Sequence, residues 1–247
     1  MSYFFQVGGF DFPSYVRDAF PAPGFNYDEF TSYADQTAVD AVYIPLSTNI
    51  DGNTTDDRLD YIAVTDTTND SNSRALSSAV SDTAWVLRFR YSLTAQSLNG
   101  TGYAMFPSIG LSSANHNTAE ETAQDGLCIN PWQDNLVRPY HISYADATNL
   151  SGDIGAGNTR VTQFTETATV GDDYYVELKR TTATNFNGQL FSGVWITSVE
   201  SRALTVPSTV QTLAYFVVKN AVNTQNQAGS QTGWIDNIGL KNAVSAW

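Results

Sequence analysis

The sequence has few of the residues that build disulfides and transition-metal sites. Its 247 residues include one cysteine and two histidines. A single cysteine excludes a disulfide within the chain and a cysteine-based zinc site. The histidines, His116 and His141, lie too far apart in the sequence to predict a metal-binding pair. Cys128 stands between Leu127 and Ile129, so we expect it in a buried strand rather than as a reactive thiol.

Positive charge is also scarce. The chain has 12 Lys and Arg residues against 25 Asp and Glu residues, which gives a formal net charge of -13. A surface of this sign repels the phosphate backbone of nucleic acids and the headgroups of anionic membranes. We therefore expect neither nucleic acid nor a membrane surface among the partners of this protein.

Long hydrophobic runs are missing as well. No stretch approaches the ~20 apolar residues that a membrane-spanning helix needs, so we expect no membrane insertion. The N-terminal stretch MSYFFQVGGFDFPSYV has no early Lys or Arg, and Gln6, Gly8 and Asp11 interrupt its apolar residues. We therefore expect no signal peptide. A place on a virion surface or outside a cell would then require another route of release, for example inside a virus particle.

The sequence is instead rich in strand-like segments. Residues 84–96 read AWVLRFRYSLTAQ, in which Trp85 and Phe89 fall on one side of a strand while Arg88 and Arg90 fall on the other. Residues 174–180, YYVELKR, show the same alternation, and many shorter runs follow between turn-rich loops. Helix signals are nearly absent. We expect an all-β fold with two packed sheets in a single domain, residues 25–247.

Residues 1–24 differ from the rest of the chain. They are dense in aromatic side chains, but proline and glycine interrupt them too often for regular structure. We expect this arm to pack either on its own domain or on a neighbouring subunit. The arm residues expected to make such contacts are Tyr3, Phe4, Phe5, Phe10 and Phe12.

Several segments in order resemble the concanavalin A-like lectin/glucanase superfamily. They are NYDEFTSYADQTAVDAVYIPLS, SDTAWVLRFRYSLTA, GYAMFPSIGLSS, VGDDYYVELKRTTATNFNGQLFS, QTLAYFVVKN and GWIDNIGLKN. The resemblance covers roughly residues 26–243. It implies a two-sheet antiparallel jelly roll whose curved sheet often carries a carbohydrate groove. It also implies that calcium can join the first and last strands, and Asp28 and Asp236 are the positions that match this role. No other cofactor is expected.

The sequence lacks the catalytic patterns of enzymes with this fold. Glucanases of the superfamily carry an E-x-D-x-x-E strand, which this chain does not have. Glu177 has Lys179 on the same side of its strand, which predicts an ion pair rather than a catalytic carboxylate. The Arg, Gln-x-His and Tyr-Lys set of the related lyases is also missing, and His141 beside Tyr140 is the nearest approach to it. We expect no enzymatic activity.

Binding of a glycan requires flat aromatic faces and planar polar groups. Trp132 in the segment NPWQDN is expected in a loop, where it either contacts a glycan or caps the sandwich edge. Arg88 and Arg90 lie on the outward side with Tyr175, where they form either a binding surface or a solvated charge ladder. Tyr140 and His141 complete the candidate glycan set. By contrast, we expect Trp85, Trp195 and Trp234 in the core because they lie inside strand patterns.

Three functions agree with these features. The first is a non-catalytic structural protein of a virus or phage particle, such as a capsid decoration, spike or fibre subunit, that forms a homo-oligomer or binds other virion proteins and attaches to surface glycans. The second is a free-standing lectin or carbohydrate-binding module. The third is a divergent glycan hydrolase or lyase. A fold alone does not choose among them.

Overall fold

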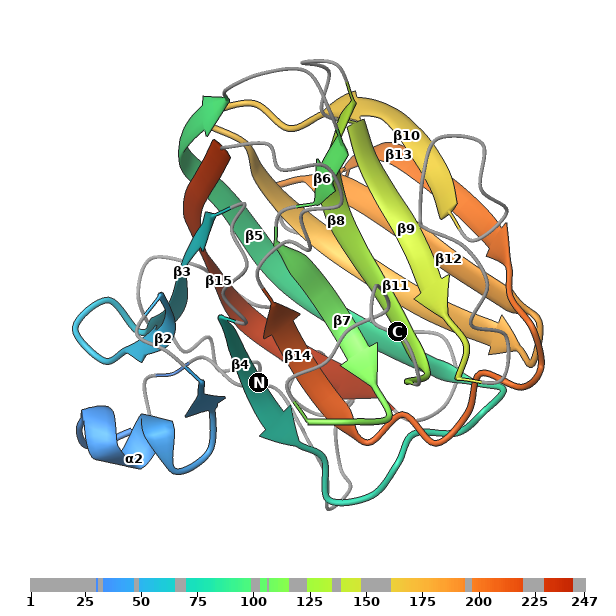
Figure 1. Ribbon diagram of the computed structural model, residues 1–247, viewed down its shortest axis with the longest axis horizontal. Helices are drawn as coiled ribbons and strands as arrows, with labels where there is room; N and C mark the ends of the chain where they lie inside the picture. The colour runs from blue at the N-terminus through green and yellow to red at the C-terminus, as the bar shows by residue number, and fades with distance from the viewer. Residues whose placement is uncertain are drawn as a thin grey trace, which may run out of the picture.

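Two antiparallel β-sheets pack face to face in a computed structural model of the chain (Figure 1). The structure describes residues 30, 33–46, 49–64, 70–98, 103–105, 107–115, 124–134, 139–147, 161–193, 197–219 and 229–241. The arm, residues 1–24, lies outside them, as do Asp28 and Trp195. Among the described residues, no helix is long and apolar enough to cross a membrane.

Each sheet combines strands that follow one another in the chain with strands from distant parts of it. The eight-stranded sheet contains, in spatial order, β1 (Ile44–Pro45), β4 (Ser71–Ala75), β14 (Tyr215–Lys219), β7 (Ser108–Ser112), β8 (Gly126–Asp134), β9 (Pro139–Ala145) and β10 (Val161–Thr167), with β6 (Tyr103–Met105) paired to β8. The seven-stranded sheet contains β13 (Thr197–Thr205), β12 (Asn185–Ser192), β11 (Asp173–Thr182), β5 (Trp85–Leu98), β15 (Gly229–Lys241), β3 (Arg58–Val64) and β2 (Ile50–Asn53). The predicted all-β, two-sheet antiparallel sandwich is confirmed.

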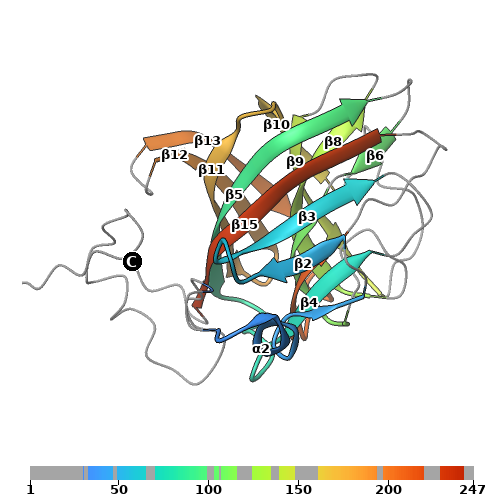
Figure 2. The same ribbon diagram turned by 90° about the vertical axis from the view of Figure 1, so that its left-hand side faces the viewer.

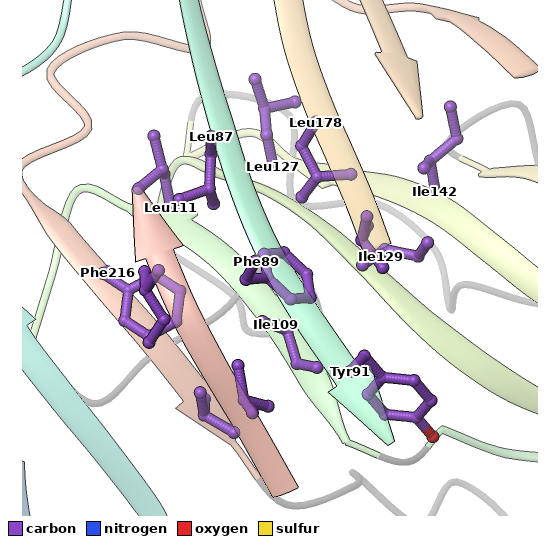
Figure 3. Close-up of a cluster of buried hydrophobic side chains, with 14 of the residues drawn as sticks. Leu87, Phe89, Tyr91, Ile109, Leu111, Leu127, Ile129, Ile142, Leu178 and Phe216 are labelled. Atoms are coloured by element: carbon purple, nitrogen blue, oxygen red, sulfur yellow. The ribbon is translucent and has the colours of Figure 1, made fainter. Parts of the chain in front are cut away.

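The core lies between the two sheets, where the alternation of the strands predicts it. On β5, Trp85, Leu87 and Phe89 are fully buried. Figure 3 shows Leu87 and Phe89 among core side chains of the opposite sheet. Ile109 of β7 and Ile129 of β8 belong to the same cluster. Because successive side chains of a strand point to opposite faces, the arginines between these core residues of β5 must lie on the outer face.

One short helix departs from the expected pattern. α2 (Gln36–Asp40) begins after Asp35, whose side chain accepts a hydrogen bond from the backbone N–H of Ala38 at 3.0 Å. This is an N-cap, which satisfies one of the donors that the first helical turn leaves unpaired. The sequence did not predict this helix, because a five-residue helix carries almost no periodicity.

The strand β15 contains an irregularity that decides which of its side chains face the core. Ile235 and Ile238 are both fully buried although they are three residues apart. Asn237, with a φ of 52°, accounts for this spacing, because the register of β15 against β5 shifts between Asp236 and Gly239. A bulge residue of this kind inserts one extra position into a strand.

Side chains close one edge of the sandwich. The carboxylate of Glu200 on β13 accepts hydrogen bonds from the backbone N–H groups of Thr165 and Glu166 on β10, each at 2.9 Å. Arg202 Nε donates to the carbonyl oxygen of Gln163 at 2.8 Å. These bonds join the edge strands of the two sheets and occupy backbone groups that an open edge presents to other chains.

Candidate functional site

The outer face of the seven-stranded sheet gathers charged and aromatic side chains. The neighbouring strands β5, β15, β3 and β2 run side by side in Figure 2. Arg90 of β5 is paired directly with Tyr175 of β11, and Arg88 is paired with Glu177. The prediction that Arg88, Arg90 and Tyr175 share one face is therefore confirmed.

Both arginines are held by acidic side chains. Arg90 makes a bidentate contact with Asp173, with Nε and Nη2 at 2.8 and 2.6 Å from the two carboxylate oxygens. Arg88 Nε lies 2.7 Å from Glu177 Oε2. The expected ion pair of Glu177 thus exists, but its partner is Arg88 on the next strand rather than Lys179. Charge-assisted bonds of this geometry hold the guanidinium groups in place.

Trp234 of β15 occupies the same outer face, so its predicted place in the core was wrong. Its neighbour Ile235 is fully buried, and adjacent residues of a strand cannot both face the core. Arg90 Cζ lies 4.7 Å from the centre of the Trp234 ring, and Arg58 Cζ lies 5.5 Å from it. A guanidinium at such a distance is attracted by the negative face of an aromatic ring.

We call this surface the Trp234 face, defined by Arg58, Asp60, Arg90, Asp173 and Trp234. Asp60 and Ser92 are the direct partners of Trp234 on the two neighbouring strands. Arg58 Nε donates to Asp60 Oδ1 at 2.6 Å. The side chains of Asp60 and Asp173 are 39% and 44% exposed, so both reach solvent. Tyr175, in contrast, is 3% exposed and lies beneath Arg90, where it supports the face without offering a surface.

Asp236, a predicted calcium ligand, lies beside the Trp234 face. Its Oδ2 atom is 3.7 Å from Arg90 Nη1. Burial raises the pKa of Asp236 to about 6, while the nearby Arg90 and the amide of Asn237 act in the opposite direction. The described residues include no group of three or more His, Cys, Asp or Glu side chains that could hold a metal ion. Asp28 lies outside the described residues, so the calcium pair Asp28 and Asp236 stays a prediction.

The structure separates Tyr140 and His141 from the arginines. Both belong to β9 of the eight-stranded sheet. Tyr140 is 2% exposed within the core, and its hydroxyl donates to Asp172 Oδ2 at 2.8 Å. His141 faces the opposite side of that sheet, and burial lowers its pKa to about 4, so the imidazole is neutral at pH 7. The six predicted glycan residues therefore do not form one site.

The eight-stranded sheet carries a buried polar row on its outer side. Asn130 of β8 pairs directly with His141, and Lys219 of β14 pairs with Ser71 and Ser108 on its two neighbours. The row residues Ser71, Ser108, Asn130, His141 and Lys219 are all at most 3% exposed. Within the described part of the chain, neither amide atom of Asn130 has a hydrogen-bond partner. In this conformation the row offers no surface to a large ligand.

Trp132, the predicted loop aromatic, belongs to strand β8, where it pairs with Met105 of β6. The expectation of a loop at this position was wrong. Pro131 lies between the part of β8 that pairs with β7, which ends at Ile129, and the part that pairs with β6, which begins at Trp132, and proline is tolerated at such a break in pairing. The side chain of Trp132 lies outside what the structure describes, so its role in glycan binding stays a prediction.

Comparisons with known proteins identify the fold. No protein-family model and no curated protein sequence matches the chain. Among solved structures it is similar to the exoplasmic/lumenal domain of VIP36 in a Ca2+/Man3GlcNAc-bound form, with a TM-score of 0.50, 10% identity, and coverage of 90% of this chain and 92% of that one. A legume lectin-like domain from Entamoeba histolytica has a TM-score of 0.50 and 8% identity, with coverage of 88% and 96%. The family 7 alginate lyase A1-II' has a TM-score of 0.47 and 11% identity, with coverage of 91% and 93%.

The chain therefore has the same two-sheet β-sandwich fold as these two lectin-type domains. The two TM-scores of 0.50 support the architecture, and identities of 10% and 8% do not carry over any residue's role. The function has to be argued from the residues of the Trp234 face themselves.

Proposed function

We propose that this protein is a non-catalytic carbohydrate-binding protein that holds its glycan on the Trp234 face. One observation carries the proposal: an indole ring lies on the outer face of the sheet between two guanidinium groups, with solvent-exposed carboxylates beside them. An aromatic ring packs against the apolar C–H face of a sugar, and fixed planar donors and acceptors bind its hydroxyl groups.

The arrangement is organised before a ligand arrives. Arg90 is held by Asp173, and Arg58 is held by Asp60, so neither guanidinium needs to be ordered when a sugar binds. A preorganised surface loses less conformational entropy on binding. The VIP36 domain, solved with Man3GlcNAc, supports the proposal as an example of this fold holding an oligosaccharide.

The absence of catalysis is part of the proposal. Hydrolysis of a glycosidic bond needs two carboxyl groups that face each other across the scissile bond, one as acid and one as base or nucleophile. On the Trp234 face, Asp60 and Asp173 each bind an arginine at 2.6 to 2.8 Å. Carboxylates engaged in this way are suited to orienting donors rather than to attacking an anomeric carbon.

Trp234→Ala tests the proposal. We expect this variant to lose binding to the polysaccharides that the unaltered protein retains, with an affinity loss of at least about tenfold, because one stacked aromatic residue contributes about 1–3 kcal/mol at such a site. Affinity gel electrophoresis against a panel of soluble polysaccharides measures the effect.

Val199→Ala is the matched control. Val199 is 39% exposed on β13 at the far edge of the same sheet, so its replacement removes a surface apolar group away from the Trp234 face. This control should bind like the unaltered protein. Equal binding by Trp234→Ala and the control would refute the role of the Trp234 face.

We further propose, on the sequence alone, that the protein acts as a structural subunit of a virus or phage particle. The aromatic arm, residues 1–24, suggests contacts between subunits, and it lies outside the described residues. Light scattering should then show an oligomer for the full chain and a monomer for a chain lacking residues 1–24. Two monomeric species of equal stability would remove the support for this role.

A further inference from the structure

Each arginine of the Trp234 face is shared by two carboxylates. Arg58 Nη2 lies 3.0 Å from Asp56 Oδ2, in addition to the contact of Arg58 with Asp60. Arg90 contacts Asp173 and also lies near Asp236. Among the residues that the structure describes, these contacts place four acidic groups and two basic groups around the indole, an excess of two negative charges when all are ionised.

The ratio of acidic to basic groups determines which ligand groups the two guanidinium groups are able to bind. Proteins bind carboxylate and sulfate groups through bidentate contacts with arginine. Here the Nε and Nη2 atoms of Arg90 already bind Asp173, and Nε of Arg58 already binds Asp60. An acidic sugar would have to displace one of these aspartates, and it would then meet the negative charge of the remaining ones. A neutral sugar hydroxyl is not repelled by the aspartates. It accepts hydrogen bonds from the arginines or donates them to the aspartates without displacing either.

We propose that the Trp234 face selects neutral glycans and rejects acidic ones, with Asp60 and Asp173 as the residues that determine this selectivity. The inference rests on the proposed function and adds the chemical class of the ligand. The net charge of -13 on the whole chain acts in the same direction, because it lowers the concentration of anionic polymers near the surface. Because Asp60 and Asp173 lie close to the indole, they repel an acidic glycan at the binding face itself. This repulsion adds to that of the net charge of the whole chain.

Two single variants and one charge-matched control test the inference. Asp60→Asn and Asp173→Asn each remove one negative charge from the face and release one arginine contact. Asp57→Asn removes the same charge from the exposed turn between β2 and β3, where Asp57 makes no contact with either arginine among the described residues. All three variants therefore have equal net charge.

The measurement is the retardation of the full chain in native gels that contain a neutral β-glucan, a neutral mannan or alginate, relative to gels without polysaccharide. We expect a neutral polysaccharide to retard the unaltered protein and alginate to leave it unaffected at low ionic strength. Asp60→Asn and Asp173→Asn should gain binding to alginate by about threefold or more, since like charges suppress the wrong partner. Asp57→Asn should not.

Each remaining outcome overturns a defined part of the argument. If alginate retards the unaltered protein as strongly as the neutral polymers do, the face binds glycans but the selectivity is wrong. If Asp57→Asn gains as much as Asp60→Asn, the overall charge rather than the face repels acidic glycans. If no polysaccharide retards the protein, the proposed function itself fails, and the selectivity fails with it. Thermal unfolding monitored by circular dichroism confirms that all variants remain folded.

Discussion

Replacing Arg180 with leucine is expected to lower the free energy of unfolding by about 2–4 kcal/mol, because one buried carbonyl group and two partly exposed ones lose their donor. Arg180 is fully buried on the core-facing side of β11. Its Nη1 donates to the carbonyl oxygen of Val210 at 2.6 Å, and its Nη2 donates to that of Ala183 at 2.5 Å. Nε makes a longer contact of 3.4 Å with the carbonyl of Thr182.

The guanidinium of Arg180 joins the turn after β11 to the loop before β14. Burial lowers the pKa of Arg180, and the nearby Asp82 and Asp125 act in the opposite direction. Leucine would remove the whole fork of guanidinium donors. The buried carbonyl of Val210 costs about 1–3 kcal/mol when it loses its partner, and the carbonyls of Thr182 and Ala183, which solvent can reach, cost less.

Urea denaturation of Arg180→Leu, with Lys179→Leu as the control, measures this effect. Lys179 is the preceding residue of β11 and lies on the outer face, partly exposed, so its replacement should change the free energy of unfolding by about 0.5 kcal/mol or less. Similar values for the two variants would show that the buried guanidinium is not needed to hold the two loops.

Replacing Gly233 with alanine is expected to destabilise the protein by about 3 kcal/mol, because the site has no room for a Cβ atom. A Cβ on Gly233 would lie well under 3.0 Å from the carbonyl oxygen of Ser92 and from the hydroxyl oxygen of Tyr61. These two atoms are themselves hydrogen-bonded, with Tyr61 Oη donating to the Ser92 oxygen at 3.1 Å. Alanine would therefore push β15 away from β5 or break this bond.

The same variant should also weaken glycan binding, because Gly233 precedes Trp234 and a shift of β15 moves the indole away from Arg90. A double-mutant cycle with Tyr61→Phe separates the two clashes. Without the Tyr61 hydroxyl, Gly233→Ala should cost less than it does in the unaltered protein. The clashes with the Ser92 carbonyl oxygen and with the ring carbon Cζ, which phenylalanine keeps, should remain. If the cost is the same in both backgrounds, the tyrosine hydroxyl plays no part in the packing around Gly233.

Alternation along single strands was sufficient to assign the faces of the longest strands. Trp85, Leu87 and Phe89 were placed in the core, and Arg88 and Arg90 on the outer face, without knowledge of any neighbour. The reason is local, because successive side chains of an extended chain point to opposite sides whatever strand lies beside them. On β11 the same alternation places Arg180 on the core side together with Leu178, two residues earlier. The sequence therefore already indicated that Arg180 faces the core.

For Trp234, the sequence contains the signal for the outer face, although its position inside a strand pattern led to the expectation of a core residue. Ile235 is apolar and Asp236 is acidic, so the alternation GWID puts Trp234 on the side of the aspartate rather than in the core. Asn237 has a positive φ, which allows Ile238 to face the core three residues after Ile235. This irregularity interrupts the two-residue alternation of β15. The short helix α2 was not predicted, because its main sequence signal is one residue, the N-cap Asp35.

The sequence by itself determined that this protein is an all-β sandwich, that its surface is acidic, and that arginines line an outer strand face. Only the tertiary structure decided which strands lie side by side, and hence that Arg58 and Arg90 flank Trp234 while Tyr140 and His141 belong to the other sheet. Strand pairing joins residues that are far apart in the chain, and it depends on the packing of both sheets at once. The periodicity of any one segment carries no information about its partner, so the candidate site could not be assembled from the sequence alone.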